Sequence, residues 1–476
     1  MLVPMSPVDA MFLLADTPSR PMHVGAAALF APPDTGAPQP GADAWFAADV
    51  ADQFAAAVGR RQVAPLWRRT ARRHPALPAL WTWRQAETVD LGYHVQRHGL
   101  PAPGGHTELT DLIARLHATP LDHARPLWEL HLIEGLADGR VAVYFKIHHA
   151  LADGVAAMRL LAAALSPDPG RRAMPAPWEP AEPHERHLHL VGGNAADRPG
   201  RASKLLGAAR TTAGEAVGLP LALARATGAG VRGRGGPLAL APARTVFSSP
   251  IGGPRRYAAR SWPFERLRLV AKSADATVGE VIVATSGGAL RTYLRERGAL
   301  PGRALTATVP VSLRPDDRGD GGDGGGNRIG ALACTLATDL ADPAARLAAI
   351  RTALRGGKDL FAAHSRAQVL AMSALGAAPL AAGMLTGRPW FSPAPAVMIS
   401  NIPGPSRPLY WNGARLDALY PASVPVDGQA LNITCASTGD AIHFGLTACR
   451  TAAADLSALP EHLDTALAAL ERAAGL

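Results

Sequence analysis

The stretch 141–165 constrains the fold of this chain more than any other. Residues 141–145 are apolar and favour a buried β-strand, whereas residues 155–165 are rich in helix formers. The pair His148 and His149 therefore lies where a predicted strand ends and a predicted helix begins. Because α/β proteins usually place their chemistry at strand ends, this turn is the first candidate for a functional site.

The residue types in this turn favour proton transfer. Imidazole can accept a proton near neutral pH. Asp153 can cap the following helix or hold a cation, and Gly154 permits close approach of the backbone. The pair His148-His149 could instead be half of a metal site or a satisfied pair in the core. A metal site needs three or four ligands, and we expect no cysteine or carboxylate–histidine cluster nearby to complete one.

Length and composition indicate a soluble or membrane-peripheral protein of two domains. The chain has 476 residues, too many for one ordinary core, and 48% of them are hydrophobic. Its three cysteines form no metal motif or disulfide framework, which is typical of a reducing compartment. No signal peptide is evident in residues 1–14, and no uncharged apolar run is long enough to span a membrane. We expect a cytoplasmic location.

The formal net charge of +9 does not identify a partner by itself. Nucleic acid, anionic lipid and phosphorylated cofactors are all compatible with it. Arginines gather in residues 60–73, near Trp67, Trp81 and Trp83, but no nucleic-acid motif accompanies them. We therefore expect no nucleic-acid partner, and we interpret the three tryptophans as core or interface residues.

The order of predicted elements gives two α/β halves. Ser6 before Pro7 predicts a capped helix near the start. Strands are predicted at 91–98 and 266–270, among others. A Pro-rich and then Gly- and Arg-rich region separates the halves, so the predicted division is residues 1–180, a crossover linker at 181–256, and residues 257–476.

Several motifs, in order, resemble one known family. His148-His149-x-x-x-Asp153-Gly154 matches the HHxxxDG motif of CoA-dependent acyltransferases, the superfamily of chloramphenicol acetyltransferase and peptide-synthetase condensation domains. More narrowly, the chain is similar to the bacterial wax ester synthase/diacylglycerol acyltransferase (WS/DGAT) family. The segments that carry this resemblance are residues 4–9 with Phe12, Pro126-Leu127-Trp128, residues 310–314, residues 400–405, and the stretch 420–432.

The resemblance implies two chloramphenicol-acetyltransferase-like α/β domains with an active-site tunnel between them. It implies that His149 is the general base, with His148, Asp153 and Gly154 completing the motif. Other residues that the family motifs implicate are Arg314 as the partner of Asp153, Asn401 in support of the oxyanion, and Pro126, Leu127, Trp128 and Ser400 along the tunnel.

The sequence departs from the family pattern at one point. The family carries an Asn-Asp pair at the start of a helix, where this chain has Gly279 and Glu280. Acyl transfer needs a donor for the oxyanion, and Gly279 offers no side-chain amide. Backbone N–H, water or another residue must then supply that hydrogen bond.

The resemblance implies an O-acyltransferase that moves a long-chain acyl group from acyl-CoA to diacylglycerol, a long-chain alcohol or both. The product is triacylglycerol or wax ester, and neither a metal nor a cofactor is required beyond acyl-CoA as co-substrate. Because such acceptors partition into lipid, we expect peripheral binding to the inner membrane face or to lipid droplets. Two alternatives stay open: an acyltransferase of the same fold that uses a carrier-protein thioester or a hydroxylated natural product, and a catalytically impaired lipid-surface protein.

Overall fold

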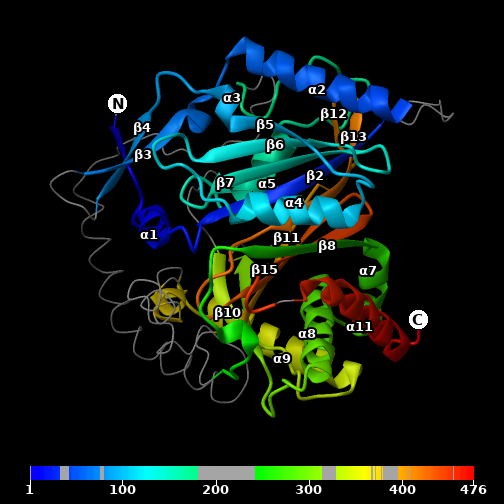
Figure 1. The fold of residues 1–476 in the computed structure, drawn as a ribbon. Helices are drawn as coiled ribbons and strands as arrows, with labels where there is room; N and C mark the ends of the chain where they lie inside the picture. The colour runs from blue at the N-terminus through cyan, green and yellow to red at the C-terminus, as the bar shows by residue number, and fades with distance from the viewer. Residues whose placement is uncertain are drawn as a thin grey trace.

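The computed structural model places most of the chain in two mixed α/β halves, each built on a six-stranded sheet (Figure 1). The residues that it describes are 2–32, 42–74, 80–180, 242–312, 329–365, 368–369, 371–376, 378, 395–405, 407–453 and 455–476. Most of the predicted linker, residues 181–241, lies outside them. The expectation of an α/β fold with two sheet-rich domains is confirmed.

The first sheet has the order β12-β13-β2-β7-β6-β5. Its strands are β2 (His23–Ala31), β5 (Val95–Gly99), β6 (Trp128–Glu134), β7 (Val141–His148), β12 (Tyr410–Trp411) and β13 (Ala414–Ala422). Strand β7 is buried along its whole length, as its apolar sequence predicts. It pairs antiparallel with β2, in a register that places His23 opposite His148.

Helices cover both faces of the first sheet. The helices of this half are α1 (Pro7–Ala15), α2 (Ala42–Arg60), α3 (Leu91–His94), α4 (His106–Ala118) and α5 (Gly154–Ala163). Residues of α2 and α5 pack with one face of β2 and β7 in one apolar cluster, whereas α4 packs with the other face. Helix α4 also contacts β8 of the second half, so it lies between the two sheets (Figure 1).

The second sheet has the order β10-β9-β11-β14-β15-β8. Its strands are β8 (Arg255–Pro263), β9 (Thr306–Ser312), β10 (Ile329–Thr335), β11 (Val397–Ile402), β14 (Leu431–Thr438) and β15 (Ala441–Cys449). Helices α7 (Phe264–Ser273), α8 (Val278–Glu296), α9 (Pro343–Ala362) and α11 (Leu459–Ala473) pack together with this sheet in one large apolar core. A small third sheet joins β1 (Leu2–Pro4), β4 (Trp81–Gln85) and β3 (Arg69–Arg73).

Two strands from the C-terminal part of the chain belong to the first sheet. Strand β13 pairs antiparallel with β2, and β12 pairs with β13. The same β13 packs closely on β15, where a Cβ built on Gly445 would lie 1.7 Å from the carbonyl oxygen of Pro421. The halves are therefore joined by an exchanged strand as well as by the connection after residue 180. The boundaries at 180 and 256 stay a prediction.

Two predicted strands are partly or wholly helical. Residues 91–98 begin with α3, because Asp90 accepts a hydrogen bond from the backbone N–H of Tyr93 (3.3 Å) and caps a helical turn before β5. Residues 266–270 lie within α7, so the strand predicted there is wrong. Leu267, Val270 and Ala271 are all buried, which is the i, i+3, i+4 spacing of a helix face.

Other local predictions are confirmed. Ser6 caps α1 by accepting a hydrogen bond from the N–H of Asp9 (3.1 Å). Trp67 and Trp83 are buried in apolar clusters, in agreement with their interpretation as core residues. Among the described residues, no helix has the length and apolarity needed to cross a membrane.

Candidate active site

His149 lies directly after β7. Its backbone N–H donates to the carbonyl of Met22 (2.8 Å), which ties the turn to the start of β2. Its ring stacks on Phe12 of α1, with ring centroids 4.0 Å apart and planes 16° apart. The buried Nδ1 makes no hydrogen bond to another described residue, and the residue as a whole is partly exposed. The ring is therefore held by stacking and is not engaged through Nδ1 by a neighbour.

The surroundings of His149 keep its imidazole neutral. Burial lowers the pKa of His149 to about 4, although the nearby Asp153 carboxylate opposes this shift. At pH 7 the ring is unprotonated. Because the residue is partly exposed, its neutral imidazole can accept a proton from a substrate hydroxyl.

His148 differs from His149 in that both of its ring nitrogens are engaged. Its side chain is fully buried. Nδ1 accepts a hydrogen bond from the backbone N–H of Ala150 (3.0 Å), so the proton is on Nε2, which lies 3.2 Å from Oδ2 of Asp16. Both ring nitrogens of His148 are therefore engaged within the protein, and its place in the catalytic set stays a prediction.

Asp153 and Gly154 begin helix α5. Oδ1 of Asp153 accepts a hydrogen bond from the N–H of Ala156 (2.7 Å), which is the predicted cap. A Cβ on Gly154 would lie 3.2 Å from Cδ1 of Ile402 in β11, so the start of α5 closely approaches the second sheet. Arg314, the predicted partner of Asp153, lies outside the described residues.

The helix start with Gly279 and Glu280 forms a capping box. Oε2 of Glu280 accepts from the N–H of Thr277 (2.7 Å), and the N–H of Glu280 donates to Oγ1 of Thr277 (3.2 Å). The carboxylate of Glu280 is thereby used to start α8. Gly279 adjoins open space, since a built Cβ would have only Oγ1 of Thr277 within 4.0 Å. Their role in oxyanion support stays a prediction.

The remaining predicted site residues fall into two groups. Ser400 and Asn401 lie on β11 opposite Thr434 and Cys435 of β14, and Asn401 is exposed. Pro126, Leu127 and Trp128 are buried, and the carbonyl of Leu127 accepts the N–H of His148 (3.0 Å). This second segment supports the histidine turn through its backbone. That either group lines a tunnel stays a prediction.

The structure adds a cluster that local sequence spacing did not reveal. Asp16, His123 and His148 place three potential ligand atoms within 4.8 Å of one another. The expectation that no carboxylate–histidine cluster lies near the pair is therefore corrected. Asp16 precedes His123 by 107 residues and His148 by 132 residues, so no local motif could have indicated the cluster.

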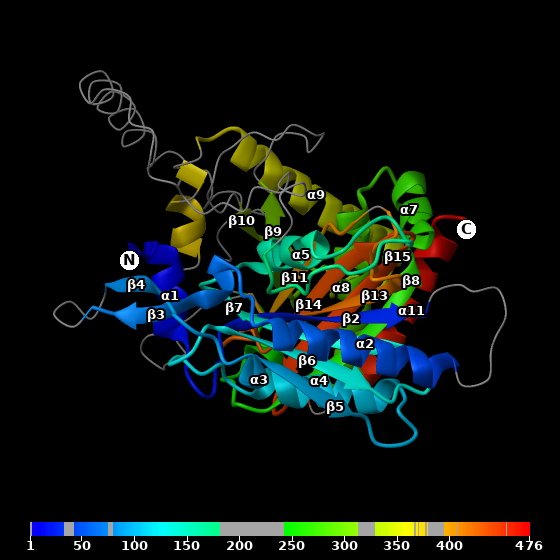
Figure 2. The same cartoon turned by 90° about the horizontal axis from the view of Figure 1, so that it is seen from above.

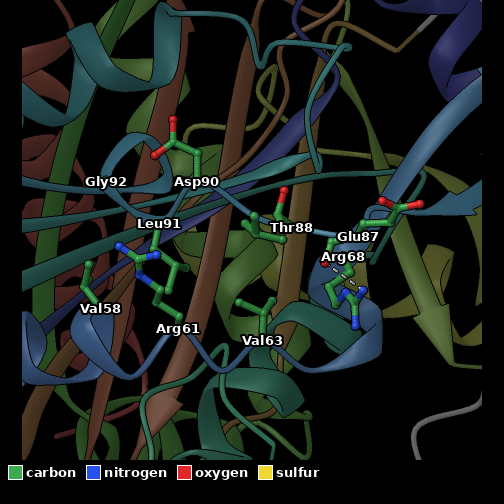
Figure 3. Close-up of a pocket in the computed structure, with 10 residues that line it drawn as sticks. Val58, Arg61, Val63, Arg68, Glu87, Thr88, Asp90, Leu91 and Gly92 are labelled. Atoms are coloured by element: carbon green, nitrogen blue, oxygen red, sulfur yellow. Dashed lines mark hydrogen bonds between the residues drawn. The ribbon is translucent and has the colours of Figure 1, made fainter.

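A pocket of about 430 Å³ lies away from these residues, at the end of α2 (Figure 3). Arg61 and Arg68, two members of the predicted basic patch, lie on either side of Val63 in this pocket. Arg68 donates to the carbonyls of Ala86 (2.8 Å) and Glu87 (3.0 Å). None of the predicted site residues lines this pocket.

Comparisons with known proteins identify the family. A model of the wax ester synthase/diacylglycerol acyltransferase catalytic domain matches residues 5–282, and a model of the WS/DGAT C-terminal domain matches residues 325–471. A provisionally named diacylglycerol O-acyltransferase of Mycobacterium tuberculosis H37Rv is 50% identical over 468 residues, which cover 97% of this chain and 89% of the relative. The chain belongs to the WS/DGAT family.

Solved structures agree with this assignment. The WS/DGAT of Marinobacter aquaeolei VT8 matches with a TM-score of 0.76 and 33% identity, over 100% of both chains. The first condensation domain of the calcium-dependent antibiotic synthetase matches with a TM-score of 0.58 and 18% identity, over 100% of this chain and 96% of that one. The second likeness shows a shared fold. As a WS/DGAT family member, the chain is an acyltransferase.

Proposed function

We propose that this acyltransferase moves a long-chain acyl group from acyl-CoA to the hydroxyl of diacylglycerol or a long-chain alcohol, with His149 as general base. The observation that carries this proposal is the state of His149. Its ring is neutral at pH 7, its Nδ1 bonds no described neighbour, and the same turn approaches the second sheet at Gly154. The names of the relatives supply the substrate class.

The chemistry requires a base at this position because an alcohol is a poor nucleophile while it keeps its proton. In the proposed step, His149 takes the hydroxyl proton as the alcohol oxygen bonds to the thioester carbon. The C–S bond then breaks, the CoA thiolate leaves, and the proton on His149 passes to that sulfur. The low pKa keeps the ring neutral, with one nitrogen able to accept a proton, and the Asp153 carboxylate stabilises the imidazolium that forms.

Peripheral contact with a lipid surface follows from the proposed substrates. Both acceptors partition into lipid, and arginines of the 60–73 patch are candidates for contact with anionic headgroups. Part of that patch serves the fold, since Arg60 pairs with Glu179 (2.7 Å). Binding to anionic vesicles that weakens as salt rises would support this part of the proposal.

The test is a product assay with labelled palmitoyl-CoA and separated neutral lipids. For His149→Gln we expect transfer to fall by about 10²- to 10⁴-fold, the usual contribution of a general base. His106→Gln is the matched control, because His106 is exposed and Gln can keep its hydrogen bond to the carbonyl of Ala259 (2.8 Å). Unchanged transfer by the His149 variant would refute the base assignment, and preference for an acyl-carrier-protein donor would refute the acyl-CoA assignment.

A further inference from the structure

Two short chains of hydrogen bonds start at the carboxylate of Asp16 and end next to His149. In the first, Oδ1 accepts the N–H of Met22 (3.1 Å), and the carbonyl of Met22 accepts the N–H of His149 (2.8 Å). In the second, Oδ2 accepts Nε2–H of His148 (3.2 Å), and Nδ1 of His148 accepts the N–H of Ala150 (3.0 Å). One carboxylate thus holds the two consecutive peptide N–H groups of residues 149 and 150.

This carboxylate is well placed to act as a rigid anchor. The Asp16 side chain is 6% exposed, and it also meets Nε2 of His123 at 2.7 Å. Burial alone would raise the pKa of Asp16, but the hydrogen bonds from His123 and His148 lower it to about 2. Asp16 is therefore ionised throughout the neutral range and accepts hydrogen bonds on both oxygens.

The tautomer of His148 favours hydrogen bonding over metal binding in this cluster. A metal on Nε2 of His148 would require the ring proton to move to Nδ1. The N–H of Ala150 already points at Nδ1, so two donors would then face each other. The arrangement fits an ionised carboxylate that receives N–H donors.

Helix α1 holds His149 from a second direction. Phe12, four residues before Asp16, stacks on the His149 ring at 4.0 Å. Residues four apart share one face of a helix, so α1 supplies the stacking ring while the residue that ends it supplies the anchor. Both views of the molecule show α1 beside the end of β7 (Figures 1 and 2).

We propose that Asp16 is a positioning residue for acyl transfer: it sets the tautomer of His148 and, through Met22 and His148, the position of the His149 ring. The proposal rests on the proposed function, because it requires His149 to be the base. Small displacements of a reacting group are costly, and a misplacement of about 1 Å can lower a rate about 100-fold. Asp16 itself need not touch substrate.

The test is Asp16→Asn, with Asp138→Asn as the matched control on the exposed turn between β6 and β7. The amide has one oxygen, so either Met22 or His148 faces an NH₂ group in place of an acceptor. We expect kcat to fall by about 10- to 100-fold, while KM for palmitoyl-CoA stays within about twofold. The control should keep both constants.

A spectroscopic readout separates positioning from general loss of folding. In two-bond ¹H–¹⁵N spectra of ¹⁵N-histidine protein, His148 should show the Nε2–H tautomer, and Asp16→Asn should change it. If that variant does not fold, His148→Gln replaces it. Gln can still donate to Asp16 through its NH₂ group, but it has no acceptor at the position of Nδ1 for the N–H of Ala150, so the same fall in kcat is expected.

Three results would overturn the proposal: wild-type kcat in Asp16→Asn or His148→Gln, an unchanged His148 tautomer in Asp16→Asn, or stoichiometric Zn²⁺ binding that Asp16→Asn abolishes. Failure of the proposed function looks different, because His149→Gln would then keep wild-type transfer. Loss of transfer in His149→Gln together with wild-type kcat in Asp16→Asn would refute the positioning role alone.

Discussion

At the scale of single residues, two adjacent histidines of the same sequence motif have different states. His148 is fully buried and uses both ring nitrogens in hydrogen bonds, whereas Nδ1 of His149 bonds no other described residue. The two rings meet different neighbours. The His148 ring contacts Asp16, directly after α1, and the His149 ring stacks on Phe12 of α1.

The state of His149 predicts the pH dependence of the reaction. A base acts when deprotonated, and the pKa of this ring is about 4. The value of kcat/KM should therefore stay level from neutral pH down to about 5 and fall below it, since this ratio reports the free enzyme. Initial rates with palmitoyl-CoA between about pH 4.5 and 8 measure this. An acid limb centred near the ordinary histidine value of about 6.5 would contradict it.

Asp153→Asn tests the cause of that limb. The Asp153 carboxylate raises the pKa of His149 against the effect of burial, so its removal should move the acid limb to lower pH. Asn is also a good N-cap, which keeps the start of α5 intact. An unmoved limb would show that the carboxylate does not act on the ring.

At the scale of elements, β13 joins the two halves. It pairs with β2 in the first sheet and packs on β15 in the second. Strands β13 and β15 approach closely because Gly445 of β15 has no side chain to separate it from the carbonyl of Pro421 in β13. The hydroxyl of Tyr257 donates a hydrogen bond to that carbonyl (3.0 Å). Little space is left between the strands at this point.

Gly445→Ala should therefore destabilise the protein. Its Cβ would lie 1.7 Å from the carbonyl oxygen of Pro421, and relief of such overpacking typically costs about 1–3 kcal/mol. Gly59→Ala in α2 is the matched control, because nothing lies within 4 Å of its Cβ. There we expect a gain of up to about 1 kcal/mol from helix propensity. Urea unfolding measures both, and equal midpoints for the two variants would refute the close contact.

At the scale of the whole molecule, buried histidines make the fold sensitive to acid. Among the described residues, burial is the largest cause that lowers the pKa of these histidines: His23, His94, His98, His117, His131, His148, His149 and His443. The unfolded chain binds these protons near the ordinary value of 6.5, whereas folded His117 does so only near 3. His123 is opposite in sign, since its hydrogen bond to Asp16 raises its pKa.

The sign of this linkage predicts lower stability as pH falls below about 6.5. The unfolded state binds more protons there. As the pH falls from the pKa of such a histidine in the unfolded chain to its pKa in the folded protein, the free energy of unfolding drops by about 1.4 kcal/mol per pH unit. Asp16 adds a separate loss at lower pH, between the ordinary value of 3.8 and about 2. Urea midpoints from about pH 7.5 to 4.5 measure the first window. His443→Gln should flatten the curve, and a constant midpoint down to about pH 5 would contradict the prediction.

Features that depend on residues within one or two turns of each other can be predicted from the amino-acid sequence. Local sequence predicted the strand and helix around His149 and the helix caps at Ser6 and Asp153. It also predicted, through the motifs, that the chain belongs to the WS/DGAT family. Short-range hydrogen bonds and apolar periodicity decide such features, and both are visible in a linear sequence.

Contacts between groups that are far apart along the chain became visible when the packing of whole elements was known. Local alternation at 266–270 suggested a strand, but packing on one face made it part of α7. Asp16 meets His148 across 132 residues, and β13 inserts beside a strand from the start of the chain. Such contacts depend on how whole elements pack to bury apolar surface, so no spacing in the sequence reports them.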